Sequence, residues 1–139
     1  MSSEHYREQF RRIFEALAVG DGRPFVDAMA DEFTWTIRAV ETPWARSWRG
    51  KRAVREQLLA PLFAQFATPY RNRAQRILVD GDTVVVLCTG DVVTQSGKPY
   101  CNEYCFVIRM RGAHMIELVE HLDTALVNST LQAPPAVAA

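Results

Sequence analysis

Three glycine-containing turn signals recur at regular intervals in the second half of the chain, at residues 80–82, 96–99 and 111–113. The segments between them are rich in β-branched and aromatic residues, which is typical of strands joined by tight turns. These segments are Arg76 to Val79, Thr83 to Val93, Tyr100 to Met110 and Met115 to Leu122. The pattern predicts an antiparallel meander of four strands. Because Val84–Leu87 is apolar on both sides, both faces of the sheet should be covered.

The first part of the chain shows helical periodicity instead. Apolar side chains recur at helical spacing at Phe10, Ile13, Phe14 and Leu17. The run stops at Gly20-Asp21-Gly22. Pro24 then suits the first turn of a short second helix. Two helices should therefore precede the first strand.

The middle of the chain predicts a strand, a loop and a long helix. Residues 33–37 alternate in the manner of a strand, and residues 38–49, with two tryptophans and a proline, read as an ordered loop. A long helix should open at Gly50, and Pro61 should kink it or start a new turn. Helices placed before an antiparallel sheet predict an α+β fold in one domain over residues 1–131. The remaining tail, residues 132–139, lacks periodicity and is expected to be disordered.

The charge balance restricts the partners. The 16 basic residues equal the 16 acidic ones, which argues against nucleic acid or an anionic membrane as a partner. The polar start MSSEHYREQF predicts no targeting segment, and no apolar run reaches the length of a membrane span. The three cysteines are an odd number at spacings that suit neither a disulfide nor a metal site. We expect free thiols, a cytoplasmic location, no metal and no cofactor.

Glu120 is the most informative residue for chemistry. In the last predicted strand it shares one face with Ile116, Leu118 and Leu122. A carboxylate inside an aliphatic stripe is costly to ionise, so its pKa should rise towards the range of a general acid or base. The alternative interpretation is an ordinary glutamate that pairs with an arginine or caps a turn.

Several other side chains are candidates of lower specificity. Asp91 follows Val85, Leu87 and Thr89 on one face of its strand, although Gly90 beside it suggests a bulge. The next strand presents a row of aromatic and amide side chains, namely Tyr100, Asn102, Tyr104 and Phe106. Such a row suits a pocket wall and equally an ordinary core. Trp35 should face inward, and Trp44 either closes a pocket mouth or packs beneath its loop.

Four motifs resemble the nuclear transport factor 2-like superfamily, and within it the SnoaL-like polyketide cyclases and ketosteroid isomerase relatives. They are Gly50–Val54, Val79–Asp82, Gly97–Tyr104 and Ile116–Thr124. The resemblance runs from about Tyr6 to Leu131. It implies a cone-shaped, curved mixed sheet with the N-terminal helices packed on its concave face. It also implies a pocket at the open end and a homodimer formed through the outer sheet face.

The last motif is also similar to limonene epoxide hydrolase, in which one aspartate activates water. The resemblance puts Glu120 at the position of that aspartate and Asp91 at the position of a second one. It makes Trp35, Asn102 and Tyr104 pocket-lining residues. We expect four more residues to bind the ligand beside them, namely Ile37, Trp44, Thr89 and Phe106.

This sequence departs from its relatives at three positions. Thr89 stands where the epoxide hydrolase has an arginine, and Ile37 where it has a water-binding asparagine. Against ketosteroid isomerase, Ile37 falls on the base and Phe106 on the oxyanion acid. Neither side chain transfers protons, so steroid isomerisation by that mechanism is not supported.

Three functions remain open from the sequence. The first is a cofactor-free isomerase, cyclase, dehydratase or hydratase acting on a small apolar or polyketide-like molecule, with Glu120 and Asp91 as acid and base. The second is a non-catalytic protein that binds a small apolar ligand in the same pocket. The third, ranked last, is a protein-interaction module.

Overall fold

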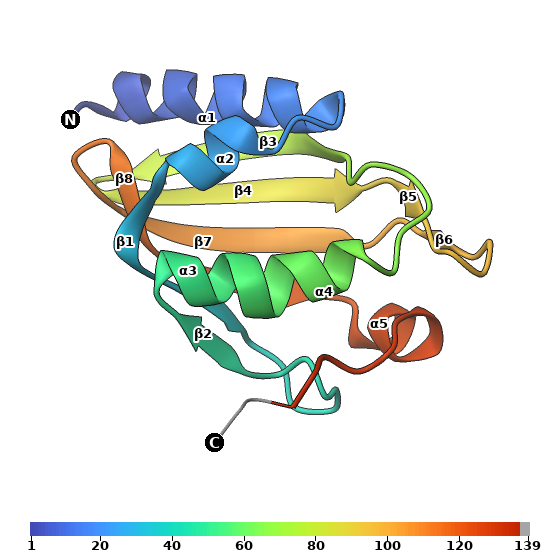
Figure 1. Cartoon of the computed structure of the whole chain (residues 1–139). Helices are drawn as coiled ribbons and strands as arrows, with labels where there is room; N and C mark the ends of the chain where they lie inside the picture. The colour runs from blue at the N-terminus through green and yellow to red at the C-terminus, as the bar shows by residue number, and fades with distance from the viewer. Residues whose placement is uncertain (137–139) are drawn as a thin grey trace.

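A computed structural model describes residues 1–136 and shows one strongly curved sheet (Figure 1). The sheet has the strand order β2-β1-β8-β7-β4-β3. Its strands are β1 (Met29–Ile37), β2 (Ser47–Arg49), β3 (Asn72–Asp80), β4 (Thr83–Gly90), β7 (Glu103–Arg111) and β8 (His114–Leu122). A separate ribbon pairs β5 (Val92–Val93) with β6 (Pro99–Tyr100). The predicted loop at 38–49 thus contains the short edge strand β2.

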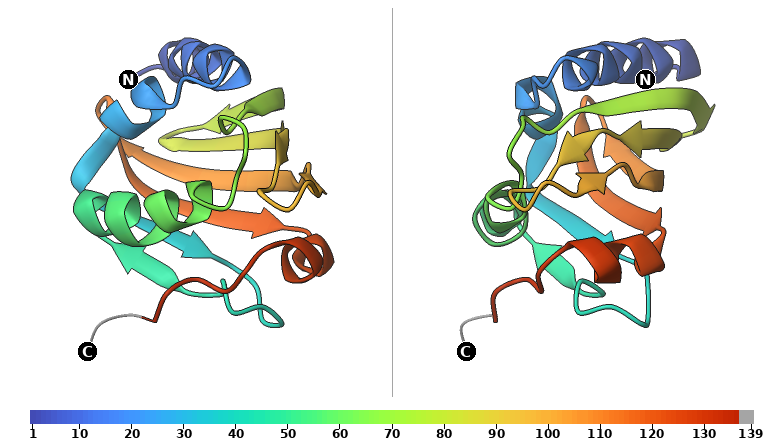
Figure 2. Two further views of the ribbon diagram at one scale, coloured as in Figure 1. Left: turned by 45° about the vertical axis from the view of Figure 1, so that its right-hand side comes forward. Right: turned by 90° about the vertical axis from the view of Figure 1, so that its right-hand side faces the viewer.

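Helical segments occupy both ends of the chain and its middle. They are α1 (Ser3–Ala18), α2 (Arg23–Asp27), α3 (Lys51–Ala53), the π-helix η1 (Val54–Leu59), α4 (Ala60–Phe63) and α5 (Thr124–Thr130). The sheet curls so that α1 and the continuous α3–η1–α4 segment lie over its concave face (Figure 2). None of the helices in residues 1–136 is long and apolar enough to cross a membrane. The predicted α+β fold with a curved mixed sheet is confirmed.

The four predicted strands form the antiparallel meander β3-β4-β7-β8. Strand β1 then pairs with β8 in parallel, which makes the sheet mixed. The register aligns Ile37 with Glu120, Glu120 with Phe106, and Phe106 with Val86. Because paired residues project to the same face, these four side chains form one row across the concave face.

The long helix changes its winding before Pro61. Residues Val54–Leu59 form a π-helix, and α4 starts with Pro61 in its first turn. Proline has no amide hydrogen to continue the preceding hydrogen-bond ladder, so a local change of winding at this point is expected. As a result Leu58 and Leu59 both face the hollow under the helix.

The outer face of the sheet keeps a partly apolar surface. Strand β4 buries Val84, Val86 and Cys88 on the concave side, whereas Leu87 on the opposite side is exposed. Leu78 on β3 is exposed on that outer side as well. A homodimer through this face would cover both leucines, and that assembly stays a prediction.

The C-terminal segment packs back onto the loop before β2, where Trp44 and Arg46 donate hydrogen bonds to it. Asp123 caps α5 by accepting hydrogen bonds from the backbone N–H groups of Ala125 and Leu126. Beyond α5, Gln132 and Pro135 accept hydrogen bonds from other parts of the chain, and Pro134 is buried. The tail predicted to be disordered comprises residues 132–139, of which residues 137–139 lie outside the described residues.

Candidate functional site

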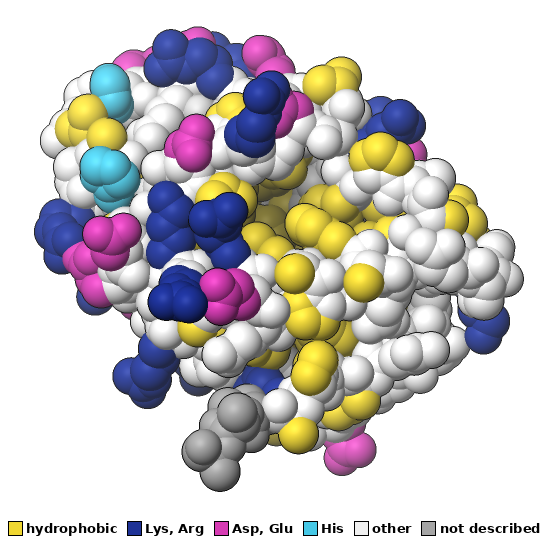
Figure 3. All heavy atoms as spheres, viewed as in Figure 1, with side chains coloured by type: hydrophobic (Ala, Val, Ile, Leu, Met, Phe, Trp, Pro, Cys, Tyr) yellow, Lys and Arg dark blue, Asp and Glu magenta, His cyan; other side chains and the backbone are white. Residues whose placement is uncertain are grey.

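A pocket opens between the concave face of the sheet and the helices. Its interior admits the centres of water-sized spheres over about 80 Å³, several times the room that one water needs. Figure 3 shows a hollow lined with hydrophobic side chains on this side of the molecule. The walls are almost entirely aromatic and aliphatic. They include Leu17, Phe25, Val26, Trp35, Ile37, Trp44, Leu58, Leu59, Leu62, Phe63, Phe106, Leu122, Val127 and Leu131.

Glu120 lies in the wall of this pocket with only 6% of its surface exposed. Its Oε1 accepts a hydrogen bond of 2.8 Å from the indole Nε1–H of Trp35. Within residues 1–136 that indole is the only hydrogen-bond partner of the carboxyl group. Burial raises the pKa of Glu120 from 4.5 to about 7, although the Trp35 hydrogen bond opposes the rise. The carboxyl group therefore changes its charge near neutral pH.

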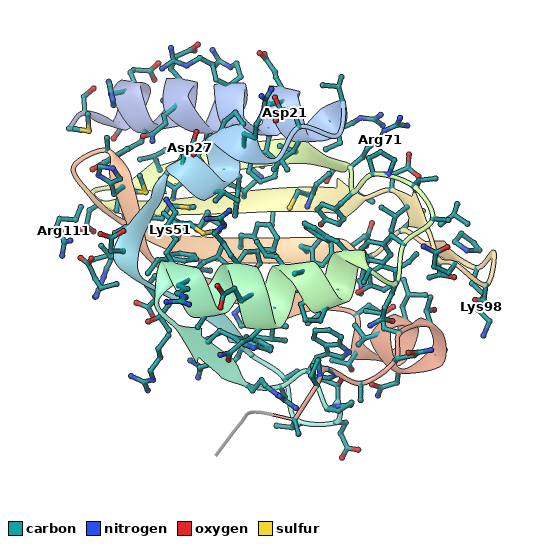
Figure 4. All side chains as sticks on the ribbon, in the orientation of Figure 1. Asp21, Asp27, Lys51, Arg71, Lys98 and Arg111 are labelled. Atoms are coloured by element: carbon teal, nitrogen blue, oxygen red, sulfur yellow. The ribbon has the colours of Figure 1, made fainter. Side chains whose placement is uncertain are left out.

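Within residues 1–136, no lysine, arginine or histidine forms an ion pair with this carboxyl group. Among the described residues, the pocket lining contains no lysine, arginine or histidine. The labelled side chains of Arg71, Lys98 and Arg111 point away from the pocket in Figure 4. The alternative interpretation of Glu120, a glutamate paired with an arginine, is therefore wrong.

Three tyrosines provide further polar groups of the pocket, together with Asn72. Tyr70, Tyr100 and Tyr104 line it, and Asn72 donates a hydrogen bond of 2.9 Å to the hydroxyl of Tyr70. Burial raises the pKa of Tyr100 to about 12, and it also raises the pKa values of Tyr70 and Tyr104 well above their usual range. All three hydroxyls stay protonated near neutral pH and are able to donate hydrogen bonds to a ligand.

Gly90 allows two of these tyrosines to approach the sheet. A Cβ atom at this position would lie 3.4 Å from the hydroxyl of Tyr104 and 3.6 Å from that of Tyr70. It would also lie 3.2 Å from the ring of Tyr104, which is closer than most Cβ contacts. The missing side chain therefore lets both hydroxyls gather over the end of β4.

The structure brings five predicted site residues together with Glu120. Trp35, Ile37, Trp44, Tyr104 and Phe106 all line the pocket. Tyr104 is the diagonal cross-strand neighbour of Glu120, a position that corresponds to about 7 Å between backbones.

Asn102 has a different role from the predicted one. The side chain is fully buried, and its Nδ2 donates to the hydroxyl of Tyr100 at 3.0 Å and to the carbonyl of Asp123 at 3.1 Å. Its Oδ1 accepts from the backbone N–H of Asp123 at 3.1 Å. These bonds consume the amide, so Asn102 holds Tyr100 and the start of α5 in place and does not line the pocket.

Asp91 and Thr89 do not reach the pocket either. The face of β4 that carries Thr89 is the outer one, and β4 ends at Gly90. Asp91 is exposed in a separate polar cleft that Thr89, Arg73 and Cys101 also line. Its carboxylate accepts a hydrogen bond of 3.8 Å from the thiol of Cys101. The prediction that Asp91 and Glu120 act together in one pocket is therefore wrong, because Asp91 lies in a different cleft.

The segment after α5 borders the pocket, since Leu131 lines it. The carbonyl of Gln132 accepts hydrogen bonds from Trp44 Nε1 at 3.1 Å and from Gln65 Nε2 at 3.2 Å. Gln65 Oε1 in turn accepts from the N–H of Gln132 at 2.8 Å. Trp44 therefore both lines the pocket and anchors the segment after α5.

Sequence reasoning missed Tyr70 and Asn72. Tyr70 follows the helix in an irregular stretch, and Asn72 opens β3 four residues before the predicted strand start at Arg76. Neither position has a periodic pattern around it. The one signal available was general: a buried tyrosine or asparagine side chain usually forms a hydrogen bond, which could have indicated a polar site at these positions.

The profile of the SnoaL-like domain matches residues 10–118, most of the chain. The protein belongs to the SnoaL-like domain family. No curated protein sequence matches this SnoaL-like chain.

Solved structures share its fold at low sequence identity. A nuclear transport factor 2-like protein of unknown function from Burkholderia pseudomallei has a TM-score of 0.76 and 20% identity, covering 96% of this chain and 100% of its own. A proposed SnoaL-like polyketide cyclase from Jannaschia sp. has a TM-score of 0.74 and 18% identity, covering 97% and 98%. TerC, co-crystallised with polyporic acid, has a TM-score of 0.72 and 17% identity, covering 88% and 95%. These similarities show the fold.

Proposed function

We propose that this SnoaL-like protein is an enzyme that moves a proton on a small, uncharged and largely apolar substrate, with Glu120 as general acid and base. The observation that carries the proposal is a carboxyl group in an apolar pocket whose pKa of about 7 populates both of its forms near neutral pH. Proton transfer is most efficient when the pKa of the catalytic group lies near the working pH.

The site supports an isomerisation, a cyclisation or a dehydration. The Trp35 indole holds Oε1, which leaves Oε2 to take a proton from a carbon beside a carbonyl group of the substrate. A hydroxyl from Tyr104 or Tyr70 stabilises the negative charge that develops on the carbonyl oxygen. Glu120 then returns the proton to another atom of the same molecule, so an isomerisation needs no further reactant.

The comparisons are compatible with a substrate of this kind. One protein of the same fold is a proposed polyketide cyclase, and TerC was crystallised with polyporic acid. For this chain the argument depends on the pocket itself, whose only ionisable carboxyl group among the described residues is Glu120.

The test is turnover by Glu120→Gln, with Glu117→Gln as the matched control on the same strand. Native mass spectrometry of freshly purified protein first identifies a retained ligand, and its chemical class selects the substrates to assay. We expect Glu120→Gln to lose about 10²- to 10⁴-fold in kcat while Glu117→Gln keeps wild-type activity. Full activity in Glu120→Gln would refute the role.

The second candidate is a binding protein that does not turn its ligand over. The single carboxyl group in the pocket favours it, because acid–base enzymes often use two ionisable groups. This candidate predicts that the wild-type protein releases the retained ligand after prolonged incubation, and that the released ligand is chemically unchanged.

A further inference from the structure

The surroundings of Glu120 combine a carboxyl group with aromatic rings. The ring centroid of Trp35, which holds the carboxyl, lies 5.9 Å from that of Phe106 and 5.8 Å from that of Phe25. The ring of Tyr104 continues this wall 5.4 Å beyond Phe106. Four aromatic side chains that line the pocket are therefore gathered on the side where Glu120 lies.

The groups that face Glu120 carry no positive charge. Its neighbours on β1 and β7 are Trp35, Ile37 and Phe106, and the helices over the pocket present aliphatic and phenylalanine side chains. Together with burial, the negative charge of Glu120 contributes to raising the pKa values of four nearby groups. They are the hydroxyls of Tyr70, Tyr100 and Tyr104 and the thiol of Cys88. Burial raises the pKa values of all four, so they are neutral near pH 7.

We propose that the pocket selects its ligands by charge and takes a small hydrophobic amine, as the ammonium ion, in preference to the alcohol of the same shape, while it excludes the matching carboxylate. Folding has already removed most of the water from Glu120, so an incoming ammonium ion loses only its own hydration. The ammonium ion then forms an ion pair with Glu120 in a site that contains little water. It also makes cation–π interactions with the electron-rich faces of the aromatic rings. A carboxylate would be repelled by Glu120, and the hydrogen-bond donors that line the pocket among the described residues are all neutral.

The inference rests on the pocket of the proposed function but not on its catalytic step. An ammonium ion holds Glu120 in its ionised form and lowers its pKa. The carboxyl is then a weaker base, so amines of this kind act as competitive inhibitors of the proposed enzyme.

The pH dependence follows from proton linkage. Below pH 7 the carboxyl of the free protein is mostly protonated and must release a proton before it pairs with an ammonium ion. Affinity for the amine should therefore rise about tenfold between pH 6 and pH 8. Affinity for the alcohol should not rise over the same interval.

Isothermal titration calorimetry with benzylammonium, benzyl alcohol and benzoate tests this on the full chain. At pH 8 we expect benzylammonium to bind at least tenfold more tightly than benzyl alcohol and benzoate to give no binding. At pH 6, titrations in two buffers of different protonation enthalpy should detect a proton released with the amine but not with the alcohol. Glu120→Gln should bind amine and alcohol with similar affinity, whereas Glu117→Gln should behave as the wild type.

Several results would overturn the inference. They are equal binding of amine and alcohol at pH 8, measurable binding of benzoate, a pH dependence that survives Glu120→Gln, or no binding of any probe. Tight alcohol binding without an amine preference would leave the proposed function standing. Wild-type turnover by Glu120→Gln would remove the proposed function and leave the charge selectivity intact.

Discussion

Strand β8 carries two glutamates three residues apart in opposite surroundings. Glu117 lies on the outer face, its side chain is 41% exposed, and its carboxylate lies 3.8 Å from the guanidinium of Arg109. Glu120 lies on the concave face, is buried and has only the neutral indole of Trp35 as a partner. Residues at an odd spacing along a strand project to opposite faces of the sheet. The two side chains therefore differ in their surroundings, with a solvated ion pair on the outer face and a reactive carboxyl group on the concave face.

The contrast between the two faces extends to β4 and β7. Side chains on the concave face of β7, such as Ile108, are fully buried, whereas the alternate residue Val107 is only partly buried. The concave face therefore carries both the core and the chemistry, and the outer face is left for solvent or for a partner.

Truncating a side chain on the concave face should lower the stability more than truncating one on the outer face. We expect Ile108→Ala to lower the free energy of unfolding by about 2–5 kcal/mol, because it leaves a cavity in the core. Val107→Ala, its neighbour on the outer face, should cost less than about 1 kcal/mol. Denaturant unfolding at low protein concentration measures both.

If the protein is a monomer and both variants lose the same free energy of unfolding, the contrast between the two faces is wrong. A loss at Val107 that grows with protein concentration would instead indicate that a second copy covers the outer face, as in the predicted homodimer.

Replacing Glu120 should stabilise the protein in a pH-dependent way. The raised pKa means that the folded protein binds more protons than the unfolded chain between pH 4.5 and 7. The wild-type stability is therefore full below pH 4.5, falls between pH 4.5 and 7 and levels off above pH 7. Glu120→Gln removes this loss and should exceed the wild type by up to about 3 kcal/mol at pH 8.

Thermal or denaturant unfolding of wild type, Glu120→Gln and Glu117→Gln at pH 5 and pH 8 checks this difference. Glu117→Gln should follow the pH profile of the wild type, since its side chain is largely solvated. An advantage of Glu120→Gln that is as large at low pH as at pH 8 would argue against a raised pKa.

Asp91→Asn should have the smallest effect. Its carboxylate is exposed in the separate cleft, so we expect stability to change by less than about 0.5 kcal/mol. Binding of ligands in the Glu120 pocket should stay within about twofold of the wild type, as measured by calorimetry. A large loss of binding would return Asp91 to the site.

The comparison of Glu120 and Asp91 also shows where sequence reasoning succeeds. Strand β8 has a polar face and an apolar face, so parity alone places Glu120 with Leu118 and Leu122. Strand β4 is apolar on both faces over Val84–Leu87, and alternation cannot tell which face is the inner one. The end of β4 at Gly90 then removes the strand pattern on which the assignment of Asp91 depended.

The remaining site features depend on long-range packing that the sequence does not display. The parallel pairing of β1 with β8 brings the Trp35 indole to Glu120, although 85 residues separate them. Tyr70 reaches the pocket from an irregular segment, and Asn102 is diverted to the backbone of Asp123 by the return of the chain after β8. Most helix and strand segments, in contrast, follow from local periodicity, although β2 and the start of β3 do not.

A carbon-13 NMR titration of the Glu120 side-chain carboxyl tests the central claim most directly. Comparison with Glu120→Gln, which lacks this carboxyl group, assigns the signal. Burial among apolar groups predicts a midpoint near pH 7 for Glu120. A midpoint near the ordinary 4.5 would mean that water or an unrecognised partner reaches the carboxyl, and the proposed chemistry would have no basis.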